Sequence, residues 1–183
     1  MPTEARSTAI TGVWELAGQP FCDKRGAFLN GFRSDEPAFA KAWGHRPIVQ
    51  VNVSRTEQVG TVRGLHLQSQ PHREAKLIRC LRGCVWDVAV DLRPHSSSFG
   101  HWHALLLTPN AANALVIPEG CAHGFQLLEP ASELLYLHSS GWVPAAETGV
   151  QCCDPQLDIA WPLPPVGLSD KDQALPSLKD LQQ

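Results

Sequence analysis

Two histidines occupy segments whose residue types could carry acid–base chemistry. His66 lies in residues 63–68 (RGLHLQ), and His123 ends residues 118–123 (PEGCAH). An imidazole gains or loses a proton near neutral pH, so it is a natural base for removing a proton from a carbon next to a carbonyl. The alternative for each is an ordinary core or surface imidazole, which is the commoner situation for a single histidine.

The spacing around these histidines also raises the question of a metal. Residues 118–123 fit Pro-x-Gly-x-x-His, one half of the signature of cupins, which are small double-sheet jelly rolls. The other half, His-x-His, has become His66-x-Gln68, which leaves only His66, His123 and Glu74 as candidate ligands. An amide oxygen is a poor substitute for an imidazole nitrogen. We therefore expect neither a metal nor another cofactor, and a metal-dependent cupin is the alternative hypothesis.

A metal-free base of this kind needs partners. Removing a proton next to a carbonyl produces an enolate, whose oxygen must be stabilised by a fixed cation or donor. Lys76, ten residues after His66, is a candidate on the adjoining strand. Epimerisation also needs an acid on the opposite face of that carbon, and Tyr136 is the only tyrosine in the chain. The alternative for Tyr136 is core packing with a hydrogen-bonded hydroxyl.

The elements that must position these side chains are mostly short strands. Apolar residues alternate best in residues 84–92, and turn residues separate similar runs. The single helix candidate covers residues 35–43, with Ser34 as its N-cap and Gly44 at its end. The pattern predicts an all-β sandwich or barrel in one domain, 1–183, with an irregular tail, 161–183, packed on it. The further strands are expected at 47–54, 61–68, 75–81, 102–108, 114–118, 124–129 and 132–138.

Composition excludes several classes of protein. The 183 residues carry a formal net charge of −3, which argues against a nucleic-acid partner. No apolar run is long enough to span a membrane, and the N-terminus has no signal-peptide pattern. The six cysteines contain no C-x-x-C pair, so we expect reduced, mostly buried thiols. The expected location is the cytoplasm.

Taken in order, segments from residue 21 to residue 176 resemble the dTDP-4-dehydrorhamnose 3,5-epimerase family, which are metal-free cupin-fold enzymes. Each segment is weakly specific alone, but the full set in this order is very specific. The segments are 21–26 (FCDKRG), 49–54 (VQVNVS), 62–68 (VRGLHLQ), 75–79 (AKLIR), 83–93, 98–102 (SFGHW), 117–125, 133–136 (ELLY), 154–155, 158–162 (DIAWP) and 168–172 (LSDKD).

The resemblance implies a fold, an activity and a set of roles. The fold would be a double-stranded β-helix, the cupin-like jelly roll, with short flanking helices, in a homodimer whose N-terminal strand is exchanged. The activity would be cofactor-free epimerisation at C3 and C5 of dTDP-4-dehydro-6-deoxy-D-glucose, giving dTDP-4-dehydro-L-rhamnose. His66 would be the base, Asp172 its orienting carboxylate, Tyr136 the acid and Lys76 the enolate stabiliser. The implied substrate-binding residues are Arg25, Asn30, Gln50, Asn52, Arg63, Gln68, His123, Trp142, Glu147 and Lys171.

This chain departs from the family pattern in its substrate-contacting residues. The Lys and the Tyr-Tyr pair usual after the catalytic tyrosine are replaced by Leu137 and by 141–142 (GW). The remaining substitutions are Val51 and Val53 beside the family's Asn, Asn30 at a common Glu, and Cys121 at an aromatic position. The alternative is therefore an epimerase that inverts only C3 or only C5. A non-catalytic nucleotide-sugar binder is less favoured, because binding alone would not require the base, its carboxylate and the acid.

Overall fold

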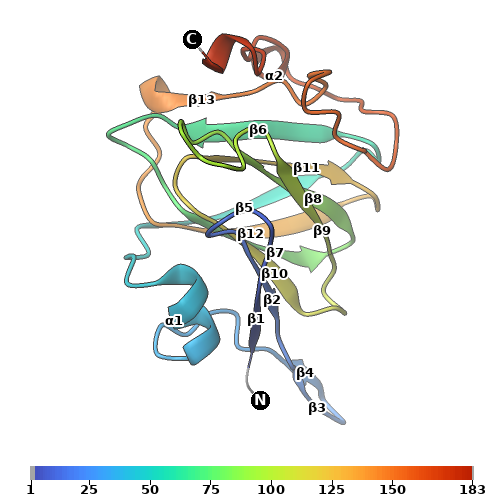
Figure 1. Ribbon diagram of the computed structural model, residues 1–183. Coiled ribbons are helices and arrows are strands. Elements are labelled where there is room, and N and C mark those ends of the chain that lie inside the picture. Colours follow the sequence, from blue (N-terminus) through green and yellow to red (C-terminus); the bar gives the residue numbers. More distant parts are fainter. Residues whose placement is uncertain (1–2, 183) are drawn as a thin grey trace.

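A computed structural model describes residues 3–182, and they form two antiparallel sheets that face each other (Figure 1). The first sheet has the strand order β1 (Glu4–Ser7), β2 (Trp14–Ala17), β10 (Asn113–Ile117), β7 (Lys76–Arg82), β12 (Ser132–His138) and β5 (Gln50–Thr56). The second has the order β13 (Glu147–Gly149), β6 (Val62–Gln68), β11 (Cys121–Leu127), β8 (Val85–Asp91) and β9 (Trp102–Leu107). This is the predicted cupin-like jelly roll.

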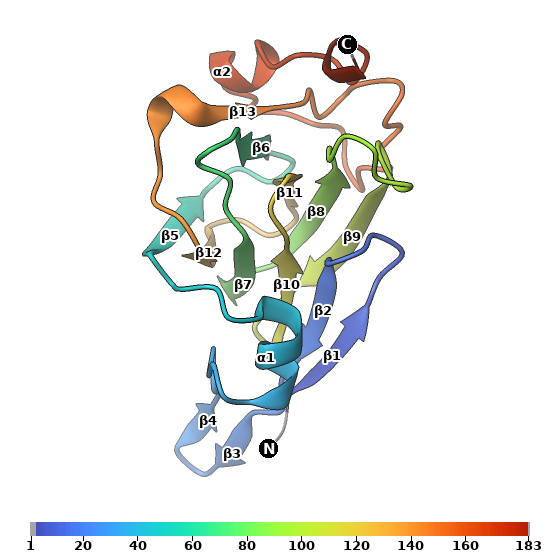
Figure 2. The same cartoon turned by 60° about the vertical axis from the view of Figure 1, so that its left-hand side comes forward.

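The main core lies between the sheets because their strands turn apolar side chains toward each other. Ile78, Leu115 and Leu134 from the first sheet meet Leu107 and Phe125 from the second, and all are buried. Part of each outer face is covered as well. Helix α1 (Pro37–Trp43) packs on the first sheet, and the C-terminal segment packs on the second (Figure 2). The sheets thus form a rigid frame on which the cavity-lining side chains stand.

The helix begins later than predicted. Its N-cap is Glu36, which is extended and makes no side-chain capping bond, so the prediction of Ser34 as the cap is wrong. Steric clash with a following proline disfavours helical backbone, so Glu36 stays extended and the helix starts at Pro37. The predicted end is confirmed, because Gly44 follows the last helical residue with φ of 69°.

The predicted strands are present, with boundaries shifted by up to three residues. The largest shifts are in β5, which begins at Gln50 rather than at residue 47, and in β11, which begins at Cys121 rather than at residue 124. Strands β1, β2 and β13, and the separate hairpin of β3 (Phe21–Asp23) and β4 (Gly26–Phe28), were not predicted. Each has only three or four residues, too short to display an alternating pattern.

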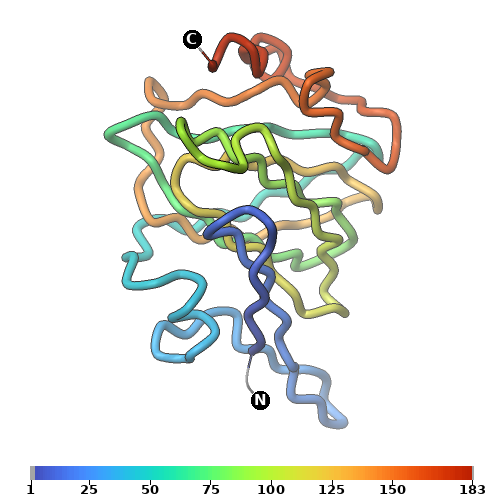
Figure 3. Tube along the Cα trace, viewed as in Figure 1, coloured from blue at the N-terminus to red at the C-terminus, as the bar shows by residue number. Residues whose placement is uncertain are grey.

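The C-terminal segment follows an irregular path over the second sheet, as predicted (Figure 3). Its only helical parts within the described residues are α2 (Asp170–Gln173) and the 3-10 turn η2 (Asp180–Gln182), and a further 3-10 turn, η1 (Pro144–Ala146), precedes β13. The indole of Trp161 donates to the carbonyl of Cys152 (2.9 Å), and the amide of Leu178 donates to Asp154 (2.8 Å). These bonds tie the chain on both sides of α2 to residues 152–154, and α2 itself contacts β6. Among the described helices, none has the length and apolarity needed to cross a membrane.

Candidate active site

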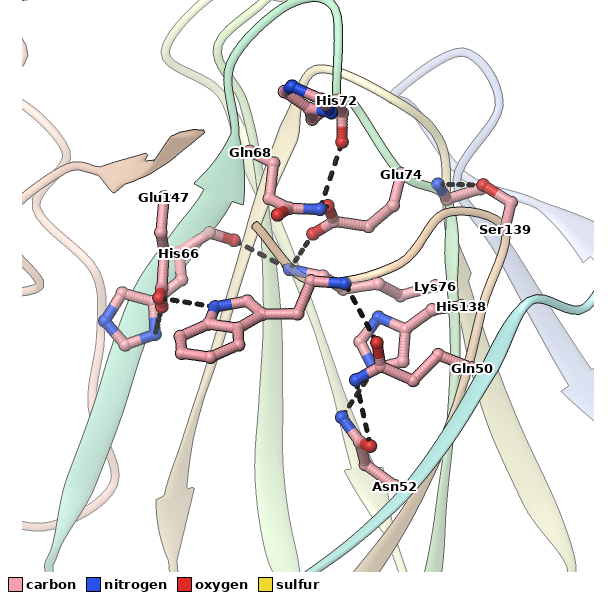
Figure 4. Close-up of polar contacts among 12 residues, drawn as sticks. Gln50, Asn52, His66, Gln68, His72, Glu74, Lys76, His138, Ser139 and Glu147 are labelled. Carbon is pink, nitrogen blue, oxygen red and sulfur yellow. Dashed lines mark hydrogen bonds and ion pairs between the residues drawn. The ribbon is translucent and has the colours of Figure 1, made fainter. Parts of the chain in front are cut away.

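A cavity of about 960 Å³ opens between the two sheets. Strands β5, β7 and β12 form one wall, β6 and β11 form the other, and β13 and α2 border it. Most of the side chains predicted for the site meet here, several of them shown in Figure 4. They are Gln50, Asn52, Arg63, His66, Gln68, Lys76, His123, Tyr136, Trp142, Glu147, Lys171 and Asp172.

His66 stands on β6 between two carboxylates. Its Nε2 lies 2.6 Å from Oδ1 of Asp172, and its Nδ1 lies 3.9 Å from Oε1 of Glu147. The Asp172 contact has the distance of an ion pair but not the alignment of a hydrogen bond, since neither atom has an aligned partner among the described residues. The imidazole is 27% exposed, toward the cavity. It is therefore accessible to a ligand while a carboxylate supports it from behind.

Asp172 is held by the start of helix α2. Ser169 and Asp172 form a reciprocal capping box, in which the Ser169 hydroxyl donates to Oδ2 of Asp172 (2.7 Å) and accepts from the Asp172 amide (3.1 Å). Burial raises the pKa of Asp172, but the contact with His66 and the bonds from Ser169 outweigh it and bring the pKa to about 2. Asp172 is thus a fixed carboxylate anion at neutral pH.

This lowered pKa predicts a pH-dependent contribution to stability. The folded state binds the Asp172 proton more weakly than the unfolded state, whose pKa is about 4. The stabilisation is therefore complete above pH 4 and is lost as the pH falls toward 2. Asp172→Asn should lower the free energy of unfolding by about 1–2 kcal/mol at pH 7, and the difference should shrink between pH 4 and pH 3.

Urea unfolding across this pH range measures the effect. Asp170→Asn is the matched control, because Asp170 lies exposed on the same helix turn. A difference between Asp172→Asn and the wild type that stays constant down to pH 3 would show that the ionised carboxylate is not its source.

Tyr136 stands on β12, on the wall opposite His66. Its hydroxyl is 3.1 Å from the hydroxyl of Ser54, and its ring has an edge contact with His123 at 5.8 Å between centroids. Burial raises the pKa of Tyr136 above its ordinary value, against the smaller lowering effect of the Ser54 bond. The phenol is therefore protonated at neutral pH and available as a proton donor to a bound ligand.

Lys76 brings a buried ammonium group to the same cavity. It stands on β7 in the first sheet, not on a strand adjoining β6, so that part of the prediction is wrong. Its Nζ contacts Oε1 of Glu74 at 3.0 Å and donates to the backbone carbonyl of His66, also at 3.0 Å. Gln68 donates to the other oxygen of Glu74, and its own carbonyl accepts from the amide of Val143 (2.6 Å). Lys76 is thus fixed next to the base, where it can stabilise a developing oxyanion.

Trp142 and Lys171 converge on Glu147 at the rim of the cavity. The Trp142 indole donates to Oε2 of Glu147 (2.8 Å), and the Lys171 ammonium forms an ion pair with the same oxygen. Burial raises the pKa of Glu147, but these two partners lower it more, so the net direction is down. Since Trp142 is 58% exposed, it presents an open aromatic face beside a cation.

The side chains considered as metal ligands have other partners. His66 contacts Asp172, Glu74 contacts Lys76, and Nε2 of His123 lies 2.7 Å from Oδ1 of Asp87. Asp87 is fully buried, and this burial raises its pKa although His123 pulls in the other direction. Residues 3–182 contain no group of three or more His, Cys, Asp or Glu side chains arranged to hold a metal ion.

Two predicted substrate-binding residues lie outside the cavity of their own chain. Arg25 is in the β3–β4 hairpin, where its exposed guanidinium pairs with Asp23 at 2.7 Å. Asn30 donates to Glu36 (3.2 Å) ahead of helix α1. A single chain therefore does not bring these two residues to the site.

Several cavity or supporting residues were missed in the sequence, and three of them matter most for the acid and the histidines. Ser54 and His138 line the cavity, and Asp87 supports His123. The signal for the first two was available, because residues two apart on a strand share a face. Ser54 follows Gln50 and Asn52 in this register on β5, and His138 follows Tyr136 on β12. Asp87 had no such signal, since the β8–β11 pairing that brings it to His123 joins distant segments.

The double-sheet fold and a cavity that collects an imidazole, a carboxylate, an ammonium and a phenol define the class. This is a cupin-like protein with the side chains of an acid–base enzyme. The model of the family dTDP-4-dehydrorhamnose 3,5-epimerase matches residues 7–180. The chain belongs to this family of isomerases, which confirms the resemblance seen in the sequence.

Individual relatives agree in covering nearly the whole chain. A dTDP-4-dehydrorhamnose 3-epimerase of Streptomyces niveus is 40% identical over 92% of this chain and 80% of its own length. A dTDP-4-dehydrorhamnose 3,5-epimerase of Mycobacterium tuberculosis is 37% identical over 98% and 89%. The crystal structure of a dTDP-6-deoxy-D-glucose-3,5-epimerase from Legionella pneumophila, in complex with dTDP-4-keto-L-rhamnose, superposes with a TM-score of 0.91. It is 35% identical and covers 97% of this chain and 93% of that one.

Proposed function

We propose that this protein epimerises dTDP-4-dehydro-6-deoxy-D-glucose without a cofactor, at C3 and C5, to give dTDP-4-dehydro-L-rhamnose. The observation that carries the proposal is the placement of His66, backed by Asp172, and Tyr136 on facing walls of one cavity. A base on one face of a sugar ring and an acid on the other are what inversion of a carbon centre requires.

In the proposed reaction, His66 removes the proton from the carbon next to the C4 ketone. The electron pair moves into the ketone to form an enolate, whose oxygen is stabilised by the ammonium of Lys76. Asp172 stabilises the imidazolium that forms. Tyr136 then donates its proton to the carbon from the opposite face. The phenolate recovers a proton from solvent, and the His66 imidazolium releases the proton that it took to solvent, so both groups are restored. Because both acidic carbons flank the same ketone, one site can process each in turn.

Binding of the nucleotide is assigned to the rim of the cavity. Arg63 and Lys171 provide cations for the diphosphate, and the open face of Trp142 can stack on the base. The other predicted contacts in the cavity, Gln50, Asn52, Gln68, His123 and Glu147, would hydrogen-bond the sugar or orient these groups. The cytoplasmic location stays a prediction.

The number of inverted centres is the finer part of the proposal. The Streptomyces niveus relative is named a 3-epimerase, whereas the Mycobacterium tuberculosis relative is named a 3,5-epimerase. We therefore keep single inversion as the second candidate. NMR of the product formed from dTDP-4-dehydro-6-deoxy-D-glucose decides between them through the ring coupling constants, with a parallel reaction in EDTA to test the metal-free assignment. A product inverted at one carbon only would overturn the double inversion. Loss of activity in EDTA would overturn the metal-free assignment.

We also propose that the active form is a homodimer in which Arg25 and Asn30 serve the partner's site. Strand β5 is an edge of the first sheet and exposes Val51 and Val53, the latter 62% exposed. The projecting β3–β4 hairpin exposes Phe21 and Phe28, the latter 75% exposed. Apolar residues on an open edge and on a projecting hairpin are typical of interfaces.

If this dimer forms, one charge introduced at the exposed edge strand β5 should dissociate it. Val53→Glu should shift the mass in light scattering from twice the 20.0 kDa of one chain to a single chain, and turnover should fall with it. Leu106→Glu is the matched control, because Leu106 is an exposed apolar residue on β9. A Val53→Glu protein that is still dimeric, or a wild type that is monomeric and active, would contradict the proposal.

A further inference from the structure

His138 is a cavity residue to which the reaction above gives no role. It is the last residue of β12, two positions after Tyr136, so both side chains lie on the cavity face of the strand. In the strand register it is paired with Gln50 on β5 and with Lys76 on β7. Figure 4 shows its imidazole between Lys76 and the pair Gln50 and Asn52.

The imidazole of His138 stacks on the phenol of Tyr136. The ring centroids are 6.0 Å apart with an interplanar angle of 21°. His123 contacts the same phenol edge-on at 5.8 Å and 74°, and Ser54 holds its hydroxyl. The orientation of the proton donor is therefore fixed by three neighbours, of which His138 is the one on its own strand.

His138 is itself fixed by a chain of amides. The backbone amide of Trp142 donates to Gln50 (2.9 Å), and Gln50 donates to Oδ1 of Asn52 (3.1 Å). The Nδ2 of Asn52 can then only donate, so Nε2 of His138 accepts at 3.4 Å and carries no proton. Burial, with the nearby Lys76 and His123, lowers the pKa of His138 to about 4, so the ring stays neutral at working pH.

From this stacking we infer that His138 is a positioning residue for Tyr136 and sets how often proton removal ends in inversion. The inference rests on the proposed epimerase function. An enolate can regain a proton from the His66 imidazolium, with retention, or from Tyr136, with inversion. In deuterated water the imidazolium proton exchanges for a deuteron before it is returned, so both routes label the carbon. Displacing a reacting group by about 1 Å can cost up to about 100-fold in rate. Without its stacking partner, the Tyr136 phenol should therefore protonate the enolate more slowly, so that a larger share of enolate is reprotonated from the His66 side. Removal of the proton by His66 should continue at its usual rate.

The test compares two initial rates in deuterated water with dTDP-4-dehydro-6-deoxy-D-glucose. One is deuterium incorporation with retention, and the other is incorporation with inversion. In His138→Ala we expect the ratio of inversion to retention to fall about tenfold, with total incorporation within about twofold of the wild type. His138→Phe keeps a stacking ring and should restore most of the ratio. His138→Asn keeps a polar group without the ring and should not.

The possible outcomes distinguish a failure of this inference from a failure of the proposed epimerase function. A wild-type ratio in His138→Ala, an equal fall of both rates, or rescue by Asn rather than Phe would overturn the role of His138. A wild-type protein that incorporates no deuterium at either carbon would refute the proposed function itself. Thermal unfolding of the three variants shows whether each is folded, and the Phe variant keeps the test decisive if the Ala variant is not.

Discussion

Replacement of His66 by alanine is expected to lower both deuterium incorporation and epimerisation by about 10³-fold or more. The imidazole is the only side chain in the described cavity that is both held by an ionised carboxylate at 2.6 Å and open to a ligand. Without it, the neighbouring carboxylates Asp172 and Glu147 are occupied by Ser169 and by Lys171 and Trp142, respectively. Nothing in this arrangement can take over as the base.

Initial rates with dTDP-4-dehydro-6-deoxy-D-glucose, followed by NMR, measure this effect. His101→Ala is the matched control, because His101 is exposed and lies outside the cavity. The control should have wild-type rates. A His66→Ala protein that is folded and retains more than about a tenth of the wild-type rate would be incompatible with a general base at this position.

Replacement of Tyr136 by phenylalanine is expected to separate two activities that the wild type combines. Inversion should fall by about 100-fold or more, because the phenol is the donor on the face opposite His66. Deuterium incorporation with retention should persist, because His66, Asp172 and Lys76 are untouched. The ring that packs against His123 and His138 is preserved, so the fold should be preserved with it.

The measurement for Tyr136→Phe is again the ratio of inverted to retained deuterated sugar at early times. Ser54→Ala serves as the comparison, because it removes the partner of the hydroxyl but leaves the hydroxyl itself. Its ratio should lie much closer to that of the wild type. Inversion at an undiminished rate in Tyr136→Phe would exclude the phenol as the acid.

The strand pattern predicted most of the fold because alternation is a local property. Residues 84–92 alternate clearly, and β8 lies at Val85–Asp91. The helix start was missed for an equally local reason, the effect of Pro37 on Glu36. The short strands β1, β2 and β13 could not be predicted, because strands of three or four residues are defined by their partners rather than by their own sequence.

The residues of the candidate site also fall into two groups: those that a local sequence pattern could identify, and those that depend on contacts between distant segments. His66 and His123 could be found from motifs, and alternation along β5 and β12 would have added Ser54 and His138. Asp172 could be assigned to His66 only through the family resemblance, because the two are separated by 106 positions and are joined by the path of the C-terminal segment. The contacts of Glu147 with Trp142 and Lys171 depend on the same path, and no spacing rule connects them.

The most direct test of the central claim is NMR of the wild-type protein with dTDP-4-dehydro-6-deoxy-D-glucose in deuterated water. The claim is that one base and one acid in this cavity exchange and invert the carbons next to the C4 ketone. We predict deuterium at both C3 and C5, with a product inverted at both centres. Deuterium at one carbon only would reduce the activity to a single epimerisation, and the absence of deuterium at both would contradict the account.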